Sequence, residues 1–202
     1  MFPNIPNNLE LKTFTGNHAR AIFNDLAWLR IQIFKSFPYL YLGELAYEEK
    51  YLERYFQSSS FFVAALYDKS QIIGATTAIG LTEESEEIKL PLIKSGFNPL
   101  ECFYFGESLL LESYRGIGLG HLFFNLREQQ ALLNPEIRTT LFCSVIRPKN
   151  HPLRPANYLP HDVFWKKRGY QPLNTFCEMS WKDLDQTEET IKSLQFWKKD
   201  WK

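Results

Sequence analysis

The chain has 202 residues, of which 45% are hydrophobic, and its 23 lysine and arginine residues balance its 23 aspartate and glutamate residues. This composition supplies a core for a folded domain and excludes a disordered chain. Because the formal net charge is zero, the molecule has no overall field that would attract nucleic acid or an anionic membrane, and we expect neither partner.

The N-terminal part of the chain predicts a strand followed by two helices. Residues 9–14 alternate between apolar and polar side chains, as a half-buried strand does. Apolar residues then recur at helical spacing over residues 18–36. An unusually aromatic link at residues 37–43 leads to a second predicted helix at residues 47–56.

The middle of the chain predicts a hairpin and then a strand, a glycine-rich turn and a helix. Residues 61–67 and 71–79 are apolar runs on either side of a short polar turn, which is typical of a β-hairpin. The acidic, proline-containing segment 82–101 predicts an inserted loop or a short helix. Residues 103–111 predict a strand, and residues 118–133 carry an apolar helical face.

The next segment predicts two more strands on either side of a short helix. Residues 139–146 are rich in β-branched side chains and should complete a βαβ-like unit. Three prolines in residues 147–155 exclude a helix there. A short helix at residues 162–168 then precedes a strand at residues 170–181.

The C-terminal segment carries apolar side chains at helical spacing, which predicts a last helix at about residues 187–201. Neither an internal repeat nor a linker interrupts the sequence. We therefore expect one domain over residues 1–202, with a core at about residues 9–181 and a C-terminal helical extension.

Three kinds of phosphate site compete for the glycine-rich stretch SYRGIGLG, residues 113–120. A P-loop is excluded because no lysine follows the glycines. The dinucleotide fingerprint needs a glycine where His121 stands. The pattern R-x-x-G-x-G, filled by Arg115, Gly118 and Gly120, would let backbone N–H groups at a helix N-terminus converge on a pyrophosphate. A strand-to-helix turn without a ligand is the remaining alternative.

With this motif in place, the element order resembles that of the GNAT superfamily of acetyl-CoA-dependent N-acetyltransferases over residues 9–181. The resemblance implies an α/β (α+β layered) fold, with a mixed, mostly antiparallel central sheet flanked by helices. It also implies transfer of an acetyl group from acetyl-CoA to a primary amine of a small molecule or peptide, by direct attack in a ternary complex and without a metal.

The same resemblance assigns binding roles to three groups of residues. The end of the strand before the glycines would bind the pantetheine arm, and the aromatic link would wall the acceptor cleft. Simple packing of the aromatic side chains under a loop is the alternative for that link. The groups are the coenzyme pyrophosphate loop at Arg115, Gly116, Ile117, Gly118, Leu119, Gly120 and His121, the pantetheine strand at Leu109, Leu110 and Leu111, and the acceptor wall at Tyr39 and Tyr41.

Glu107 is the candidate general base, because it interrupts an otherwise apolar strand shortly before the glycine loop. Its alternative role is to pair with an arginine or to cap backbone groups at a strand irregularity near Gly106. Glu112 is the second choice, although its place beside Ser113 is more typical of a solvated loop.

One departure from the GNAT pattern favours a different class of function. Residues 164–170 (FWKKRGY) resemble the closing segment of the superfamily, but Trp165 replaces the tyrosine that often protonates the leaving thiolate. A non-catalytic GNAT-fold module that binds acyl-CoA is therefore an alternative. A third hypothesis makes the aromatic C-terminal tail, residues 196–201, a docking or homodimerisation helix.

Two further features bear on the compartment and on ligands. Cys102, Cys143 and Cys177 lack metal-ligand spacing, and the N-terminal residues do not resemble a signal peptide, so we expect a soluble cytoplasmic protein without a structural metal. The basic segment 147–154 would hold an acceptor carboxylate or the 3′-phosphate of the coenzyme, or would be a solvated loop.

Overall fold

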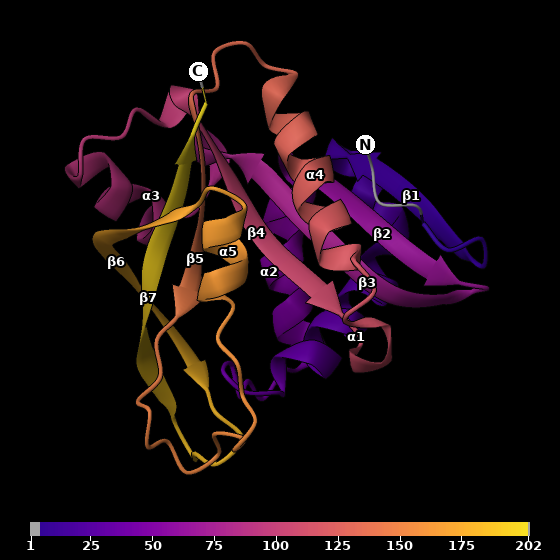
Figure 1. Cartoon of the computed structure of the whole chain (residues 1–202), viewed down its shortest axis with the longest axis vertical. Coiled ribbons are helices and arrows are strands. Elements are labelled where there is room, and N and C mark those ends of the chain that lie inside the picture. The colour runs from indigo at the N-terminus through magenta and orange to yellow at the C-terminus, as the bar shows by residue number, and fades with distance from the viewer. Residues whose placement is uncertain (1–4, 202) are drawn as a thin grey trace.

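A computed structural model describes residues 5–201 and is built on one seven-stranded sheet (Figure 1). The spatial order of the strands is β1-β2-β3-β4-β5-β7-β6. Every neighbouring pair is antiparallel except β4 and β5, so the mixed, mostly antiparallel sheet is confirmed. The strands are β1 (Leu9–Thr15), β2 (Phe62–Asp68), β3 (Gln71–Gly80), β4 (Cys102–Leu110), β5 (Thr139–Val145), β6 (Gln171–Lys182) and β7 (Glu189–Asp200).

Helices cover both faces of the sheet (Figure 1). On one face lie α1 (Phe23–Phe34) and α2 (Leu45–Gln57), and on the other lie α4 (Leu119–Leu132) and α5 (Asp162–Lys167). β2 and β3 are consequently buried along almost their whole length. Within residues 5–201, no helix combines the length and the apolar character that crossing a bilayer requires.

Two predicted segments take more specific forms in the structure. The first predicted helix divides into a 3-10 segment, η1 (Gly16–Ile22), and the α-helix α1. The acidic segment forms a 3-10 turn, η2 (Leu81–Glu83), and a short helix, α3 (Glu86–Lys94), which contacts β6.

The two parallel strands separate partway along their length. β4 and β5 pair only at the start, from Cys102 with Thr139 to Tyr104 with Leu141. Beyond this point β4 diverges toward the start of α4, while β5 stays beside β7, as Figure 1 shows. The last six residues of β4 therefore have no partner strand on their β5 side, and a gap opens in the middle of the sheet.

A β-bulge in β4 determines which face its side chains meet. Gly106 and Glu107 both lie opposite Thr77, because the register shifts between the pairs of Phe105 and Ser108 with β3. The Thr77 hydroxyl accepts a hydrogen bond from the Glu107 amide at 3.0 Å. In a regular strand Glu107 would follow Phe105 onto the α4 face, but the bulge turns it toward α1.

The prediction of a C-terminal helix at residues 187–201 is wrong, because this segment forms strand β7, which lies between β5 and β6. Leu194 and Phe196 are buried at strand spacing, whereas Ile191, which helical spacing would bury together with Leu194, is 68% exposed. An amphipathic strand with clustered aromatics can carry apolar residues three apart by coincidence. The aromatic tail is thus part of the sheet and is not a free docking helix.

Candidate active site

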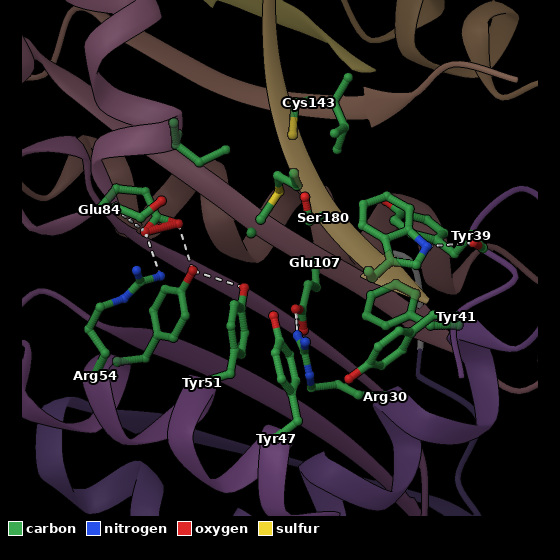
Figure 2. A pocket seen from close by; sticks show the side chains of 18 of the residues that line it. Arg30, Tyr39, Tyr41, Tyr47, Tyr51, Arg54, Glu84, Glu107, Cys143 and Ser180 are labelled. Carbon is green, nitrogen blue, oxygen red and sulfur yellow. Dashed lines mark hydrogen bonds and ion pairs between the residues drawn. The ribbon is translucent and has the colours of Figure 1, made fainter. Parts of the chain in front are cut away.

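A pocket lies on the α1 and α2 face of the sheet, at the gap between β4 and β5 (Figure 2). Its lining side chains come from α1, the link between α1 and α2, α2, the segment between η2 and α3, α3 itself, and four strands. Most are aromatic or ionisable, and they include both predicted acceptor residues and the predicted base. The structure therefore brings Tyr39, Tyr41 and Glu107 together around one cavity.

The centre of the pocket is a buried guanidinium between two carboxylates. Arg30 forms ion pairs with Glu48 and with Glu107, and the side chains are 6%, 0% and 9% exposed, respectively. The Arg30 guanidinium also lies over the Tyr51 ring, 4.1 Å from its centroid. Although burial works in the opposite direction, Tyr51 and Glu48 raise the pKa of Arg30, so it stays charged.

Glu107 thus forms an ion pair with an arginine, which is one of the alternative roles that the sequence suggested for it. The ion pair leaves its second carboxylate oxygen, Oε2, buried and without a hydrogen-bond partner among residues 5–201. A buried carboxylate oxygen with a free lone pair is able to accept a proton from a ligand in the pocket. Its use as the base stays a prediction.

Helical spacing explains why these charges are buried. Arg30 lies four residues after Leu26 on the inner face of α1, and Glu48 lies four residues before Leu52 on the inner face of α2. Both charges therefore interrupt apolar stripes, and the sequence offers this signal for an ion pair in the core. Sequence reasoning missed both residues because it treated the stripes only as packing.

Hydrogen bonds and ring packing hold Tyr39 at one end of the pocket. The Tyr39 carbonyl accepts hydrogen bonds from Arg147 at 2.7 Å and from the Trp181 indole at 3.0 Å. Its ring packs on Phe34, with the ring centroids 4.5 Å apart. Burial raises the pKa of both Tyr39 and Tyr41, which keeps their hydroxyls neutral.

Arg147 has a structural role, which neither of the two interpretations of its basic segment included. Its guanidinium makes two bonds to Asp183, at 2.7 and 2.9 Å, and donates to the carbonyls of Pro38 and Tyr39. Although burial of the carboxyl works in the opposite direction, Arg147 lowers the pKa of Asp183. These bonds tie the segment at Pro38 and Tyr39, the predicted acceptor wall, to Asp183.

A hydrogen-bonded chain of three side chains lines another side of the pocket (Figure 2). The Tyr51 and Tyr55 hydroxyls are 2.9 Å apart, and Tyr55 donates to Oε1 of Glu84 at 2.6 Å. Burial raises the pKa of Glu84 despite the lowering effect of Tyr55 and Arg54. Sequence reasoning missed Glu84 inside the acidic run, although its spacing from Leu81 and Ile88 indicates an inward-facing position.

The glycine stretch forms the turn from β4 into α4. Gly116 and Gly118 have φ angles of 82° and 91°, a region that favours glycine, and Gly118 caps the helix. Within residues 5–201, the amide N–H groups of residues 116–120 have no backbone acceptor. Five free donors at the positive end of a fourteen-residue helix suit an anionic group. The phosphate role of this loop stays a prediction.

The other predicted coenzyme residues surround this turn. Arg115 is exposed and donates to the Leu110 carbonyl at 3.0 Å, while the Leu111 amide bonds to Ile73 on β3. Leu109 is fully buried on the same face as Glu107. His121 is exposed, and its ring nitrogen lies 3.2 Å from the Arg168 guanidinium.

Trp165 does not line the pocket. It packs against Phe142 and Trp197, with ring centroids 5.1 and 5.0 Å away, in the cluster under α4 and α5. Cys143 packs against the core and also lines the pocket, where its sulfur lies 3.0 Å from the Tyr104 hydroxyl. The tryptophan is a packing residue, and the pocket's hydroxyl groups come from other elements.

Comparison with known proteins identifies the fold. No protein-family model and no curated protein sequence matches the chain. An acetyltransferase from Thermus thermophilus is similar in structure, with 14% identity, complete coverage of both chains and a TM-score of 0.57. NAA60 from Arabidopsis thaliana, solved with a bisubstrate analogue, is 14% identical, with 96% of this chain and 100% of that chain covered and a TM-score of 0.59.

A third solved structure, the ribosomal-protein-alanine N-acetyltransferase from Brucella melitensis, is 13% identical. The match covers 95% of this chain and 99% of that chain, with a TM-score of 0.58. Other similar structures are acetyltransferases of the GNAT family, and NAA60 has also been solved with acetyl-CoA. The fold of this chain is therefore the GNAT fold, as the sequence predicts.

Proposed function

We propose that this chain is a GNAT acetyltransferase that transfers an acetyl group from acetyl-CoA to a primary amine. The observation that carries the proposal is the coincidence of three features along β4. They are the gap from β5, the bulge that turns Glu107 into an aromatic pocket, and the helix N-terminus with free amides a few residues later.

The glycine loop offers unpaired amide N–H donors and open space for the pyrophosphate of the coenzyme. A Cβ atom on Gly116 would meet nothing within 4 Å, so the turn faces outward and accommodates a ligand against its backbone. Residues 115–121 would hold the pyrophosphate, and residues 109–111 would lie along the pantetheine arm. NAA60, which is similar in structure, has been solved with acetyl-CoA and with a bisubstrate analogue, and this supports acetyl-CoA as the cosubstrate.

The pocket suits the acceptor amine. During transfer the amine nitrogen forms a bond to the acetyl carbon, and the bond from that carbon to sulfur breaks. Glu107 Oε2 would take one proton from the attacking nitrogen and return it to the leaving thiolate, so that Glu107 ends the cycle unchanged. Tyr39 and Tyr41 would contact the body of the acceptor, which is a small molecule or the end of a peptide.

An acyl-CoA-binding module without turnover is the second candidate, and the packing position of Trp165 is the observation that favours it. A thiol-release assay with acetyl-CoA and a panel of primary amines separates the two. The enzyme should release coenzyme A thiol in step with acetylated amine. A protein that binds acetyl-CoA yet releases no thiol with any amine would establish the module instead.

A further inference from the structure

When Glu84 is ionised, the hydrogen bonds that join Tyr51, Tyr55 and Glu84 run in one direction. A tyrosine hydroxyl has one proton to donate and two lone pairs that accept. Tyr55 gives its proton to Glu84, at 2.6 Å. In the contact between the two hydroxyls, at 2.9 Å, Tyr51 must therefore be the donor. The oxygen of Tyr51 then keeps a free lone pair for a donor in the pocket.

The surroundings of Glu84 suit a group that receives and releases a proton. Its carboxyl is 2% exposed, and Oε2 accepts from the Ser85 amide at 2.8 Å. The same oxygen lies 3.3 Å from Arg54, whose side chain is 42% exposed and extends from the buried carboxyl to the surface. The charged and titratable groups that act on Glu84 come from four elements and are Arg54, Tyr55 and Tyr51 on α2, Glu87 on α3, Tyr104 on β4 and Cys177 on β6.

The proposed reaction leaves one proton without a destination. An alkyl ammonium such as a lysine side chain, with a pKa of about 10.4, must lose a proton before its nitrogen can attack. A second proton leaves the nitrogen during transfer, and Glu107 would hand that one to the thiolate. Arg30 already occupies Oε1 of Glu107, so the first proton needs another acceptor.

We propose that Tyr51, Tyr55 and Glu84 form a proton relay that deprotonates the acceptor ammonium before attack. This inference rests on the acetyltransferase function proposed above. The ammonium gives a proton to the Tyr51 oxygen, Tyr51 passes its own proton to Tyr55, and Tyr55 passes its own to Glu84. Both tyrosines end neutral, the carboxylate becomes a carboxylic acid, and that proton later leaves to solvent. Tyr51 touches the substrate, whereas Glu84 acts through the two tyrosines.

The test measures kcat/KM against pH for Tyr51→Phe, Tyr55→Phe and Glu84→Gln, using an amine that wild type accepts. Each change removes the proton path while keeping the side chain's size. At neutral pH we expect a loss of about a hundredfold, within the range typical of proton-transfer catalysis. The loss should shrink as pH approaches the pKa of the amine, because the acceptor then arrives neutral.

A matched control is Tyr67→Phe, which removes a tyrosine-to-carboxylate bond of 2.8 Å to Asp25 outside the pocket. It should leave kcat/KM unchanged at every pH. A loss of kcat/KM in the relay variants that stays constant with pH would mean that the three hydrogen-bonded side chains only support the fold. That result would overturn the relay. Full activity of Tyr51→Phe at neutral pH would overturn it as well.

The assay distinguishes this relay from the function it rests on. If wild type releases thiol with an amine and the relay variants show no pH-dependent loss, the relay fails while the acetyltransferase function stands. If wild type binds acetyl-CoA but releases no thiol with any amine, both proposals fail together. The affinity of each relay variant for acetyl-CoA, measured by calorimetry, should equal that of wild type, because Tyr51, Tyr55 and Glu84 lie on the acceptor side of the pocket.

Discussion

Glu84 is the residue whose burial has the clearest consequence for stability. Burial raises its pKa, so the folded chain keeps this proton at pH values where the unfolded chain has released it. The resulting stability is present below the unfolded glutamate pKa of about 4.3 and is lost as pH rises through the folded value. The loss should be about 1.4 kcal/mol for each unit by which the pKa is raised.

Urea unfolding of wild type and Glu84→Gln across pH 4 to 8 checks this prediction. Glutamine has no proton to lose, so the free energy of unfolding of wild type should fall relative to the variant as pH increases. The contributions of other carboxyl groups cancel in the difference. Parallel pH curves for the two proteins would show that burial does not raise the pKa of Glu84.

Gly118 allows a sharp test of the coenzyme loop because the chain contains a matched glycine elsewhere. Gly118 and Gly96 have φ angles of 91° and 89°, so valine at either position should cost about 1–2 kcal/mol of backbone strain. Only Gly118→Val should lose affinity for acetyl-CoA in a calorimetric titration. Equal affinity in both variants would contradict the assignment of the pyrophosphate to this loop.

Strand β7 is the element that sequence reasoning assigned to the wrong class, and its alternation can be tested directly. A helix would bury Ile191 and Leu194 together, whereas the strand exposes the first and buries the second. Leu194→Ala should lower the free energy of unfolding by about 2–5 kcal/mol. Ile191→Thr, which keeps a β-branched side chain, should change it by less than about 0.5 kcal/mol.

Chemical denaturation of the two variants beside wild type gives both values. Similar large losses would indicate that the segment packs as a helix. The other elements were predictable because their signals agreed: the hairpin of β2 and β3 has a polar turn between β-rich runs, and α4 follows glycines that require positive φ. The spacing of apolar residues in β7 matched both periods, and only its neighbours in the sheet decide between them.

At the scale of the whole molecule, the gap between β4 and β5 joins features that are far apart in the sequence. Arg30, Tyr51 and Glu84 line one pocket with Glu107 only because α1, α2 and the segment after η2 pack on the same face. The sequence predicted Tyr39, Tyr41 and Glu107 as site residues. It did not predict their partners, because a buried charge looks like any other charge until the opposing element is known.

The bulge at Gly106 is a second feature of the site that depends on contacts between distant segments of the sequence. A Cβ atom at this position would lie 2.7 Å from the Thr77 hydroxyl, so glycine allows the two strands to approach and the register to shift. Without the shift Glu107 would point to the opposite face. Whether a strand contains such a bulge depends on its partner strand, which a single run of residues does not reveal.

The most direct test of acetyl transfer at this pocket compares wild type with Glu107→Gln in a thiol-release assay, alongside the affinity for acetyl-CoA. Glutamine keeps the side chain's size, and Arg30 retains its ion pair with Glu48. We predict that kcat falls by about a hundredfold or more while coenzyme affinity stays unchanged. Unchanged turnover, or an equal loss of turnover and affinity, would contradict the account.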